Sequence, residues 1–178
     1  MLKMYKPGPL DIFIENTYRE KGIIFPSDLT VKNLAEKFNI VLITEHPFSL
    51  SIWDNEFSVI FLEEKLTELE IKIRLMHELG HVLRHNFSEL DMPNMWNNYY
   101  ELDAERFALA CAIPYYMLRY LEPNELMYPQ KIAEIFNIPL ESVIKRIQII
   151  LNHVNLPSFS QTIQNSKMKL SKINRRIT

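Results

Sequence analysis

The sequence predicts an α+β domain in which a small three-stranded sheet is flanked by helices. Three short apolar runs, at 40–44, 48–53 and 57–62, are rich in β-branched and aromatic residues, and helical periodicity precedes and follows them. The last two runs are expected to form a hairpin. A length of 178 residues fits one domain with a substantial core. We therefore expect a single domain over 1–156, with its core at about 25–150.

Two helices are expected before the strands. Apolar residues near helical spacing predict the first over 10–21, and Gly22 is a suitable C-terminal stop. The second is expected over about 30–38, because apolar residues recur there at i, i+3, i+4 and i+7, and Asn39 ends it.

A third helix is predicted to begin at Thr67. Thr67 and Glu70 form a capping box, in which each side chain accepts a hydrogen bond from the backbone of the other residue. Apolar residues follow at helical spacing to about residue 85, so one face of this helix should pack on the core.

Helices are also expected in the second half of the chain. The polar stretch 92–98 contains Pro93 and is predicted to be a loop. The helices that follow are expected near 99–112, 115–121, 129–137 and 140–152. The last two form a C-terminal helical part, 129–152, and the basic segment 157–178 is predicted to be a flexible tail.

The stretch M-H-E-L-G-H-V-L-R-H at 76–85 indicates a metal site on the third helix. His77 and His81 are four residues apart, so both imidazoles lie on one helix face and can reach one ion at about 2.0–2.1 Å. We expect a single Zn²⁺ ion. Glu78 is turned about 100° from His77, which places its carboxylate beside the ion as a general base for water.

Gly80 argues against the plainer interpretation, that the two histidines only line a polar helix face. Glycine in mid-helix costs about 1 kcal/mol relative to alanine, so it indicates close contact with a second helix. The segment Y-Y-E-L-D-A-E-R-F-A-L-A at 99–110 is a suitable partner. Small residues on its predicted helix, Ala108 and Ala112, are expected to allow the approach to Gly80.

Glu101 is the best candidate for a third ligand. A three-histidine site is excluded, because the longer motif needs Gly at 84 and His at 87, where Arg84 and Phe87 stand. Two histidines with Glu101 would leave a fourth position open, as catalytic zinc sites do. Glu105, one turn later, is expected either to orient a ligating histidine or to replace Glu101 as ligand. A solvated helix face is the alternative for both acids.

Other side chains near the motif are candidates for contact with substrate or with a developing oxyanion. They are His85, Tyr99 and Tyr100, together with His46 from the strand region. The sequence does not distinguish among them.

The chain resembles the ImmA/IrrE family of zinc metallopeptidases. The resemblance is carried by H-E-L-G-H at 77–81, E-L-D-A-E-R-F-A at 101–108 and A-I-P-Y-Y-M-L at 112–118, and it covers roughly 25–150. It implies a zincin-like fold with the H-E-x-x-H motif on the active-site helix.

The same resemblance implies roles for individual residues. It makes His77, His81 and Glu101 the ligands of one Zn²⁺ ion and Glu78 the catalytic base. Glu105 stands where the family usually has Asn or Asp, so its part remains open between a supporting residue and an alternative ligand.

The resemblance also implies a function. Family members of this size, encoded by prophages and other mobile elements, resemble site-specific proteases that cleave a helix-turn-helix repressor and so act as anti-repressors. We therefore expect a zinc metalloprotease in a bacterial cytoplasm, with a cognate repressor as its protein partner. The single Cys111 fits a reducing compartment, and no apolar run reaches the about 18 residues that a membrane helix needs.

Two alternatives remain open. One is DNA binding through 130–147, which resembles a helix-turn-helix. A basic tail follows it, since the stretch from Ser142 to Thr178 has seven Lys/Arg and no Asp/Glu. The net charge of −2 and the apolar Val143, Ile144 and Ile147 in its second helix argue against direct nucleic-acid binding. The other alternative is a zinc-containing protein that docks to a partner without proteolysis.

Overall fold

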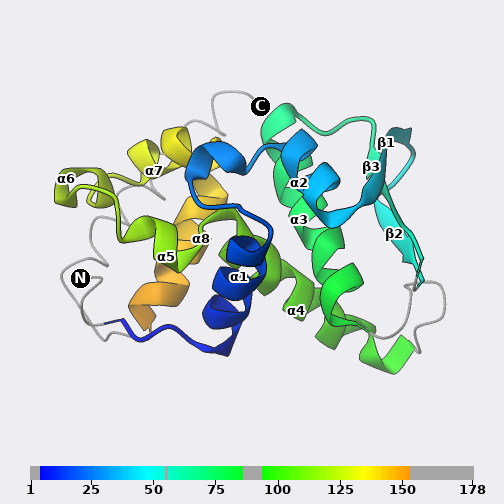
Figure 1. The fold of residues 1–178 in the computed structure, drawn as a ribbon, viewed down its shortest axis with the longest axis horizontal. Helices are drawn as coiled ribbons and strands as arrows, with labels where there is room; N and C mark the ends of the chain where they lie inside the picture. The colour runs from blue at the N-terminus through cyan, green and yellow to red at the C-terminus, as the bar shows by residue number, and fades with distance from the viewer. Residues whose placement is uncertain (1–4, 55, 86–93, 153–178) are drawn as a thin grey trace, which may run out of the picture.

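The protein has an α+β architecture, with the sheet at one end, C-terminal helices at the other and two long helices between them (Figure 1). The computed structural model describes residues 5–54, 56–85 and 94–152, with only the backbone described for 94–97, 123 and 124. The predicted tail, 157–178, lies outside the described residues. The α+β fold class expected from the sequence is confirmed.

Two helices precede the sheet, close to their predicted positions. Helix α1 spans Pro9–Glu20 and is followed by Gly22, whose φ of 71° lies in the left-handed region that glycine adopts readily. After the 3₁₀ turn η2, Pro26–Asp28, helix α2 spans Val31–Phe38. It ends at Asn39, which takes the left-handed conformation with a φ of 54°.

The sheet has the strand order β1-β3-β2, with strands Ile40–His46, Leu50–Trp53 and Ser58–Glu63 in chain order. Strands β2 and β3 are antiparallel, as the predicted hairpin requires, whereas β1 runs parallel to β3. The central strand β3 therefore joins the other two. Its buried Ile60 and Leu62, with Ser51 of β2, lie in the protein interior, and both strands pack against helix α3, Glu68–Arg84.

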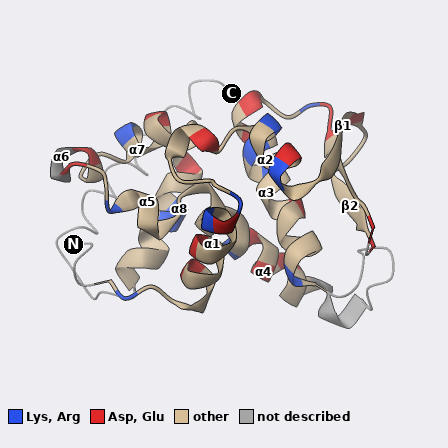
Figure 2. Cartoon of the chain, viewed as in Figure 1, with Lys and Arg blue, Asp and Glu red and all other residues tan. Residues whose placement is uncertain are grey.

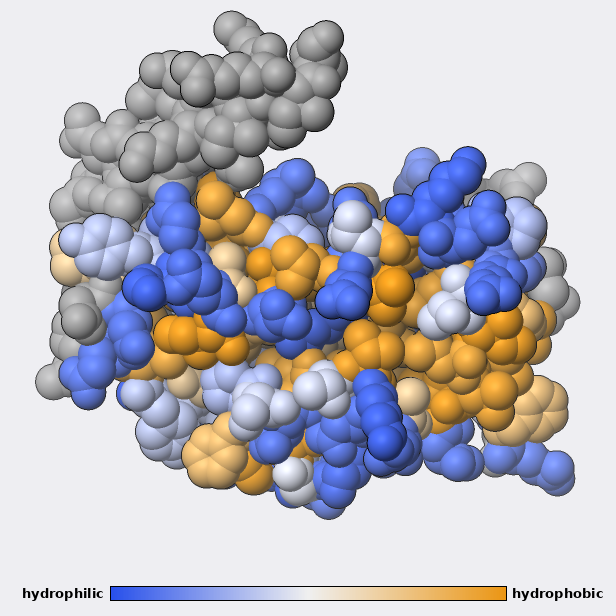
Figure 3. All heavy atoms as spheres, turned by 90° about the horizontal axis from the view of Figure 1, so that it is seen from above, coloured by the Kyte–Doolittle hydropathy of each residue, from blue (hydrophilic) through white to orange (hydrophobic). Residues whose placement is uncertain are grey.

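The opposite face of the sheet is apolar and exposed to solvent. Val41 and Ile43 of β1 are 57% and 39% exposed, and Phe48 and Phe57 beside β2 and β3 are at least half exposed. Figure 3 shows hydrophobic surface at the end of the molecule where the sheet lies.

Helices α3 and α4 form the centre of the molecule. Helix α3, Glu68–Arg84, begins with the predicted capping box, in which the Thr67 hydroxyl and the Glu70 carboxylate hold the first turn. Helix α4 spans Asn94–Ala112, so the prediction of a loop at 92–98 is wrong for 94–98. A proline immediately before a helix does not interrupt it, and the asparagines that follow are tolerated in its first turn.

The remaining helices are α5 (Tyr115–Leu118), α6 (Pro123–Leu126), which the sequence analysis did not anticipate, α7 (Pro129–Phe136) and α8 (Leu140–Asn152). Among them, α5 packs on α1, α8 packs on α4 and α7, and α6 packs on α7. Four apolar residues of α8 are almost completely buried: Val143, Ile144, Ile147 and Ile150 are at most 2% exposed. The described residues contain no helix with both the length and the apolar character needed to cross a bilayer.

A buried charge pair joins the first and last described helices. The guanidinium of Arg146 on α8 donates a hydrogen bond to Asp11 on α1, and the Tyr5 hydroxyl donates to the same carboxylate at 2.6 Å. Burial alone would raise the pKa of Asp11, but the charge of Arg146 and the Tyr5 hydrogen bond together hold the pKa below its usual value. Both partners of the pair are less than 10% exposed.

A second buried cation joins α3 to α7. The Lys72 ammonium donates a hydrogen bond to the carbonyl oxygen of Phe136, the last residue of α7, where the helix dipole favours a positive charge. Lys72 is only 5% exposed, and burial lowers its pKa from the usual 10.5 to about 8.

This lowered pKa makes stability depend on pH. Between pH 8 and 10.5 the unfolded chain still binds the Lys72 proton that the folded chain has lost, so the free energy of unfolding should rise with pH. The free energy of unfolding should rise by about 3 kcal/mol at most over this range. The hydrogen bond from the Lys72 ammonium to the Phe136 carbonyl favours the charged amine and so reduces that rise. Urea unfolding at several pH values should show this rise in wild type and in Lys65→Met, an exposed control. An undiminished rise in Lys72→Met would contradict the assignment.

Candidate metal centre

Three predicted ligand residues come together where α3 and α4 meet. His77 and His81 extend from α3 and Glu101 from α4, and their ligand atoms lie within 4.8 Å of one another. The Nε2 atoms of the two histidines are 3.1 Å apart. One Glu101 oxygen lies 3.3 Å from His77 Nε2 and the other lies 3.4 Å from His81 Nε2. Both imidazoles thus present the same ring nitrogen to one carboxylate.

The spacing of these atoms fits a zinc ion. Two ligands that bind Zn²⁺ at 2.0–2.1 Å with a tetrahedral angle lie about 3.3–3.4 Å apart, and the three observed separations are 3.1, 3.3 and 3.4 Å. The side chains are 13%, 0% and 44% exposed for His77, His81 and Glu101. The group is therefore anchored in the core at His81 and reaches solvent through Glu101.

The protonation of the group also suits a cation. Burial, followed by the charge of His77, lowers the pKa of His81 to about 4, so its imidazole is neutral near pH 7. A hydrogen bond from His77 is the main cause that lowers the pKa of Glu101. Neutral imidazoles with an ionised carboxylate are the forms in which these side chains bind metals.

Gly80 sets the distance between the two helices. A Cβ atom at this position would lie 3.0 Å from Cδ1 of Phe107 and 3.3 Å from Cα of Ala104. The predicted close contact with the second helix is therefore present. The small residue opposite Gly80 is Ala104, and not Ala108 or Ala112 as the sequence analysis expected, because α4 is rotated to bring the Ala104 backbone against α3.

Glu78 lies beside the three-residue group and faces the sheet. Its side chain is 1% exposed, and the buried Ser51 hydroxyl of β2 donates a hydrogen bond to Oε2 at 3.1 Å. Arg74, one turn earlier on α3, places a guanidinium nitrogen 3.9 Å from Oε1. A carboxylate held in this way next to a metal can accept a proton from water, which is the task of a general base.

His85 and Asp103 extend the group beyond His81. Nδ1 of His85 lies 2.9 Å from Nδ1 of His81, and Nε2 of His85 lies 3.4 Å from an Asp103 oxygen. Asp103 also accepts two hydrogen bonds from Arg84, at 2.7 and 3.0 Å. The sequence analysis gave Asp103 no role at the site, since the rotation of α4 that turns it toward α3 is not readable from the spacing.

The remaining candidates lie further from the ligand atoms. The Glu105 carboxylate is 3.4 Å from the Lys145 ammonium of α8 and is not in the group of three. Tyr100 packs its ring against His85, with centroids 4.4 Å apart, and the 63% exposed Tyr99 packs against Tyr100. His46 packs against Phe48 and Phe61 at the edge of the sheet.

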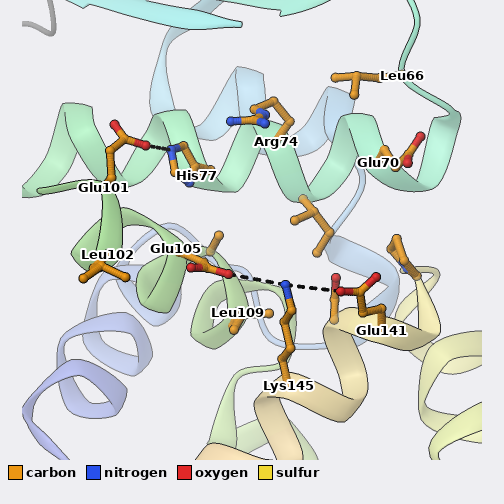
Figure 4. A pocket seen from close by; sticks show the side chains of 14 residues that line it. Leu66, Glu70, Arg74, His77, Glu101, Leu102, Glu105, Leu109, Glu141 and Lys145 are labelled. Atoms are coloured by element: carbon orange, nitrogen blue, oxygen red, sulfur yellow. Dashed lines mark hydrogen bonds and ion pairs between the residues drawn. The ribbon is translucent and has the colours of Figure 1, made fainter. Parts of the chain in front are cut away.

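A pocket of about 440 Å³ opens from the ligand group along α3, between α4 and the start of α8 (Figure 4). His77 and Glu101 lie at one end, and Glu70 and Leu66 at the other. Its walls combine apolar and charged side chains, and Lys145 stands between Glu105 and Glu141, 3.4 Å from each. The other lining residues are Ile73, Arg74, Leu102, Ala108, Leu109, Pro139 and Ser142.

Comparison with known families accounts for this arrangement. The Peptidase_M78 model, described as the IrrE N-terminal-like domain, matches residues 23–148. The chain belongs to this family. The resemblance to ImmA/IrrE peptidases is therefore confirmed, and the matched region contains the three clustered residues, Glu78 and the pocket.

Two individual relatives share about a quarter of their aligned residues with the chain. The chain is 25% identical to the "Uncharacterized protein YqaB" of Bacillus subtilis over 164 residues, covering 89% of this chain and 94% of the relative. It is 24% identical to the "Phage-like element PBSX protein XkdA" of the same organism, over 79% and 72% of the two chains.

A solved structure shares the fold. It is described as a Mycobacterium tuberculosis transcriptional regulator and aligns with a TM-score of 0.55 and 16% identity. The alignment covers 77% of this chain and 45% of that one, so the present chain spans less than half of that protein.

The geometry predicts which glutamate binds the metal. Substitution of a residue that only supports a ligand typically weakens metal affinity about 10–100-fold. Glu101→Gln should weaken Zn²⁺ affinity by more than this, because it removes a charged ligand. Glu105→Gln should leave affinity near the wild-type value, because its carboxylate is held by Lys145. Competition with a chromophoric chelator measures both. The reverse order of effects would assign the ligand role to Glu105.

Proposed function

We propose that the protein is a zinc-dependent endopeptidase whose ligands are His77, His81 and Glu101 and whose general base is Glu78. One observation carries the proposal: side chains from two helices present three ligand atoms at zinc spacing, and the residue that follows His77 on α3 is a buried glutamate. Membership of a peptidase family supports it.

The reaction that follows is hydrolysis of a peptide bond. Bound Zn²⁺ would polarise the peptide carbonyl and make water more acidic, to a pKa of about 7. Glu78 takes the proton from the attacking water as the new C–O bond forms, and then gives that proton to the amide nitrogen as the C–N bond breaks. Ser51 orients the Glu78 carboxylate, and nearby Arg74 stabilises its negative charge.

The surroundings of the site suit an extended peptide. Among the described residues, β2 pairs only with β3, so its other edge is available for an added strand close to Glu78. The 440 Å³ pocket beside His77 is large enough for a substrate side chain next to the cleaved bond. We propose that substrate backbone binds along β2 and that one side chain enters this pocket.

The substrate we propose is a helix-turn-helix repressor encoded by the same phage or mobile element, so that cleavage relieves repression. The phage-like relative supports this assignment, since its printed name places it in a phage-like element. Both the protease and its repressor would then act in the bacterial cytoplasm.

DNA binding through 130–147 has less support. The apolar residues of α8 are used in the core, and Figure 2 shows Lys and Arg interspersed with Asp and Glu on the described helices in that view. A continuous basic face, which phosphate contact requires, is not seen there.

Replacing the general base tests the activity directly. Glu78→Gln keeps the size of the side chain and removes its basicity. The rate of cleavage should therefore fall by at least about 100-fold while zinc stays bound. The candidate repressor encoded nearby is co-expressed with each variant, and intact protein and fragments are identified by mass spectrometry.

The outcomes separate the alternatives. Fragments with wild type alone support proteolysis and identify the bond. Full cleavage by Glu78→Gln would refute the mechanism. An intact repressor that co-purifies with both zinc-loaded variants would favour docking without turnover.

Ser51 offers a finer test of the same mechanism. Ser51→Ala removes the hydrogen bond to Glu78, worth about 1.5–3 kcal/mol for a charged acceptor, and should slow turnover about 10–100-fold with zinc affinity unchanged. Ser58→Ala, a partly buried serine on β3, is the control. Equal turnover by the two variants would mean that Ser51 does not orient the base.

A further inference from the structure

His85 is buried and has a protein partner at each ring nitrogen. It is 6% exposed, with Nδ1 at 2.9 Å from His81 and Nε2 at 3.4 Å from Asp103. The Tyr100 ring covers it edge to face. Both nitrogens are engaged inside the protein, so His85 is poorly placed to donate to a substrate.

The positions of the protons decide which atom donates and which accepts in the series of contacts from His81 through His85 to Asp103. If His81 binds metal through the lone pair of Nε2, its neutral ring must carry its proton on Nδ1. That N–H can only donate, so His85 must accept it at Nδ1. His85 is then protonated on Nε2 and donates to Asp103, which accepts as a carboxylate. Every atom in the chain has a role consistent with its neighbours.

Arg84 holds the Asp103 carboxylate in place. Its guanidinium donates two hydrogen bonds to that carboxylate, at 2.7 and 3.0 Å, and so places a positive charge against it. The two Arg84 bonds are made in the side-by-side geometry that fixes the carboxylate plane. The chain therefore ends on a fixed negative charge 19 residues along the sequence from Arg84.

We propose that Asp103 and His85 are positioning residues that fix the tautomer and orientation of His81 for the metal. The carboxylate polarises His85, and His85 in turn holds the His81 ring with Nε2 toward His77 and Glu101. Carboxylates that orient metal-binding histidines usually contact the ligand directly. Here a second histidine, one turn further along α3, is placed between them. The inference rests on the proposed zinc site.

This role differs from plain core packing in what it predicts. Packing depends on the shape of residue 85, whereas positioning depends on an acceptor opposite His81 Nδ1. Glutamine in place of His85 can supply that acceptor through its side-chain oxygen and still donate to Asp103 through its amide nitrogen. Phenylalanine fills the space and leaves the His81 N–H without a partner.

The test compares Zn²⁺ affinity among His85→Gln, His85→Phe and Asp103→Asn. Competition with a chromophoric chelator at one pH gives the dissociation constants without any need for a substrate. His85→Phe should bind zinc about 10–100-fold more weakly, His85→Gln should recover most of that loss, and Asp103→Asn should fall between. The double variant His85→Phe/Asp103→Asn should be no weaker than His85→Phe, because the two residues act in series.

A second readout reports the geometry of the site. Co²⁺ substituted for Zn²⁺ gives visible absorption that depends on ligand arrangement, so His85→Phe should change the spectrum and His85→Gln should preserve it. Arg106→Gln, an exposed charge on α4, is the matched control for Asp103→Asn. Asp103 is 21% exposed at its side chain, so its variant tests the proposal even if His85→Phe does not fold.

The results separate this inference from the proposed function. Folded His85→Phe and Asp103→Asn proteins with wild-type zinc affinity and an unchanged Co²⁺ spectrum would overturn the positioning role and leave the zinc site standing. A wild-type protein that binds no zinc would remove the site and this role together. Weak binding by both variants, with recovery in His85→Gln, would establish the role whether or not a peptide is cleaved.

Discussion

The close approach of α3 to α4 at Gly80 is the constraint on which the rest of the site depends. Without a Cβ at Gly80, the backbone of Ala104 and the ring of Phe107 come into contact with α3. Glu101 lies three residues before Ala104, about one helical turn away, and so reaches the two histidines. A wider separation of the two helices would carry Glu101 away from both histidines.

Helix α3 connects this contact to the rest of the fold by directing polar groups to three different neighbours. His81 faces α4, Glu78 meets Ser51 on the sheet, and Lys72 meets the end of α7. Each of these side chains is buried, and a buried polar group that loses its hydrogen-bond partner costs free energy. Each side chain is therefore restrained to the position in which it meets its partner. The rotation of α3 about its axis is thereby determined, and with it the direction of the His77 and His81 imidazoles.

Much of this arrangement was predictable from local patterns. The H-E-x-x-H spacing, the capping box at Thr67 and the unusual Gly80 are each properties of a short stretch of one helix. The family resemblance, which rests on the motifs at 77–81, 101–108 and 112–118, is confirmed. The parallel pairing of β1 with β3 was not anticipated, because strand order depends on packing across the whole sheet. The predicted start of α4, near residue 99, was too late. Polar residues and Pro93 are typical of a loop, although they also occur at the N-terminus of a helix.

The supporting residues around the site were harder to find. Asp103 meets Arg84 and His85 across two helices, and only the relative rotation of those helices decides which acid of α4 does so. Glu105 turns instead to Lys145, 40 residues away. Ser51 did leave a signal: a serine at an inward position of an apolar strand needs a buried partner, and that partner is Glu78.

The buried pair of Arg146 and Asp11 bears on how much chain is needed to make a stable domain. The family match begins at residue 23, so it includes Arg146 and leaves out both Asp11 and Tyr5. A chain reduced to the matched region would lose the carboxylate that pairs with Arg146 and would expose the faces of α4 and α5 that α1 covers. Ile14 and Tyr18 of α1 lie in the same hydrophobic core as the matched region, so that core extends beyond the stretch shared with the family.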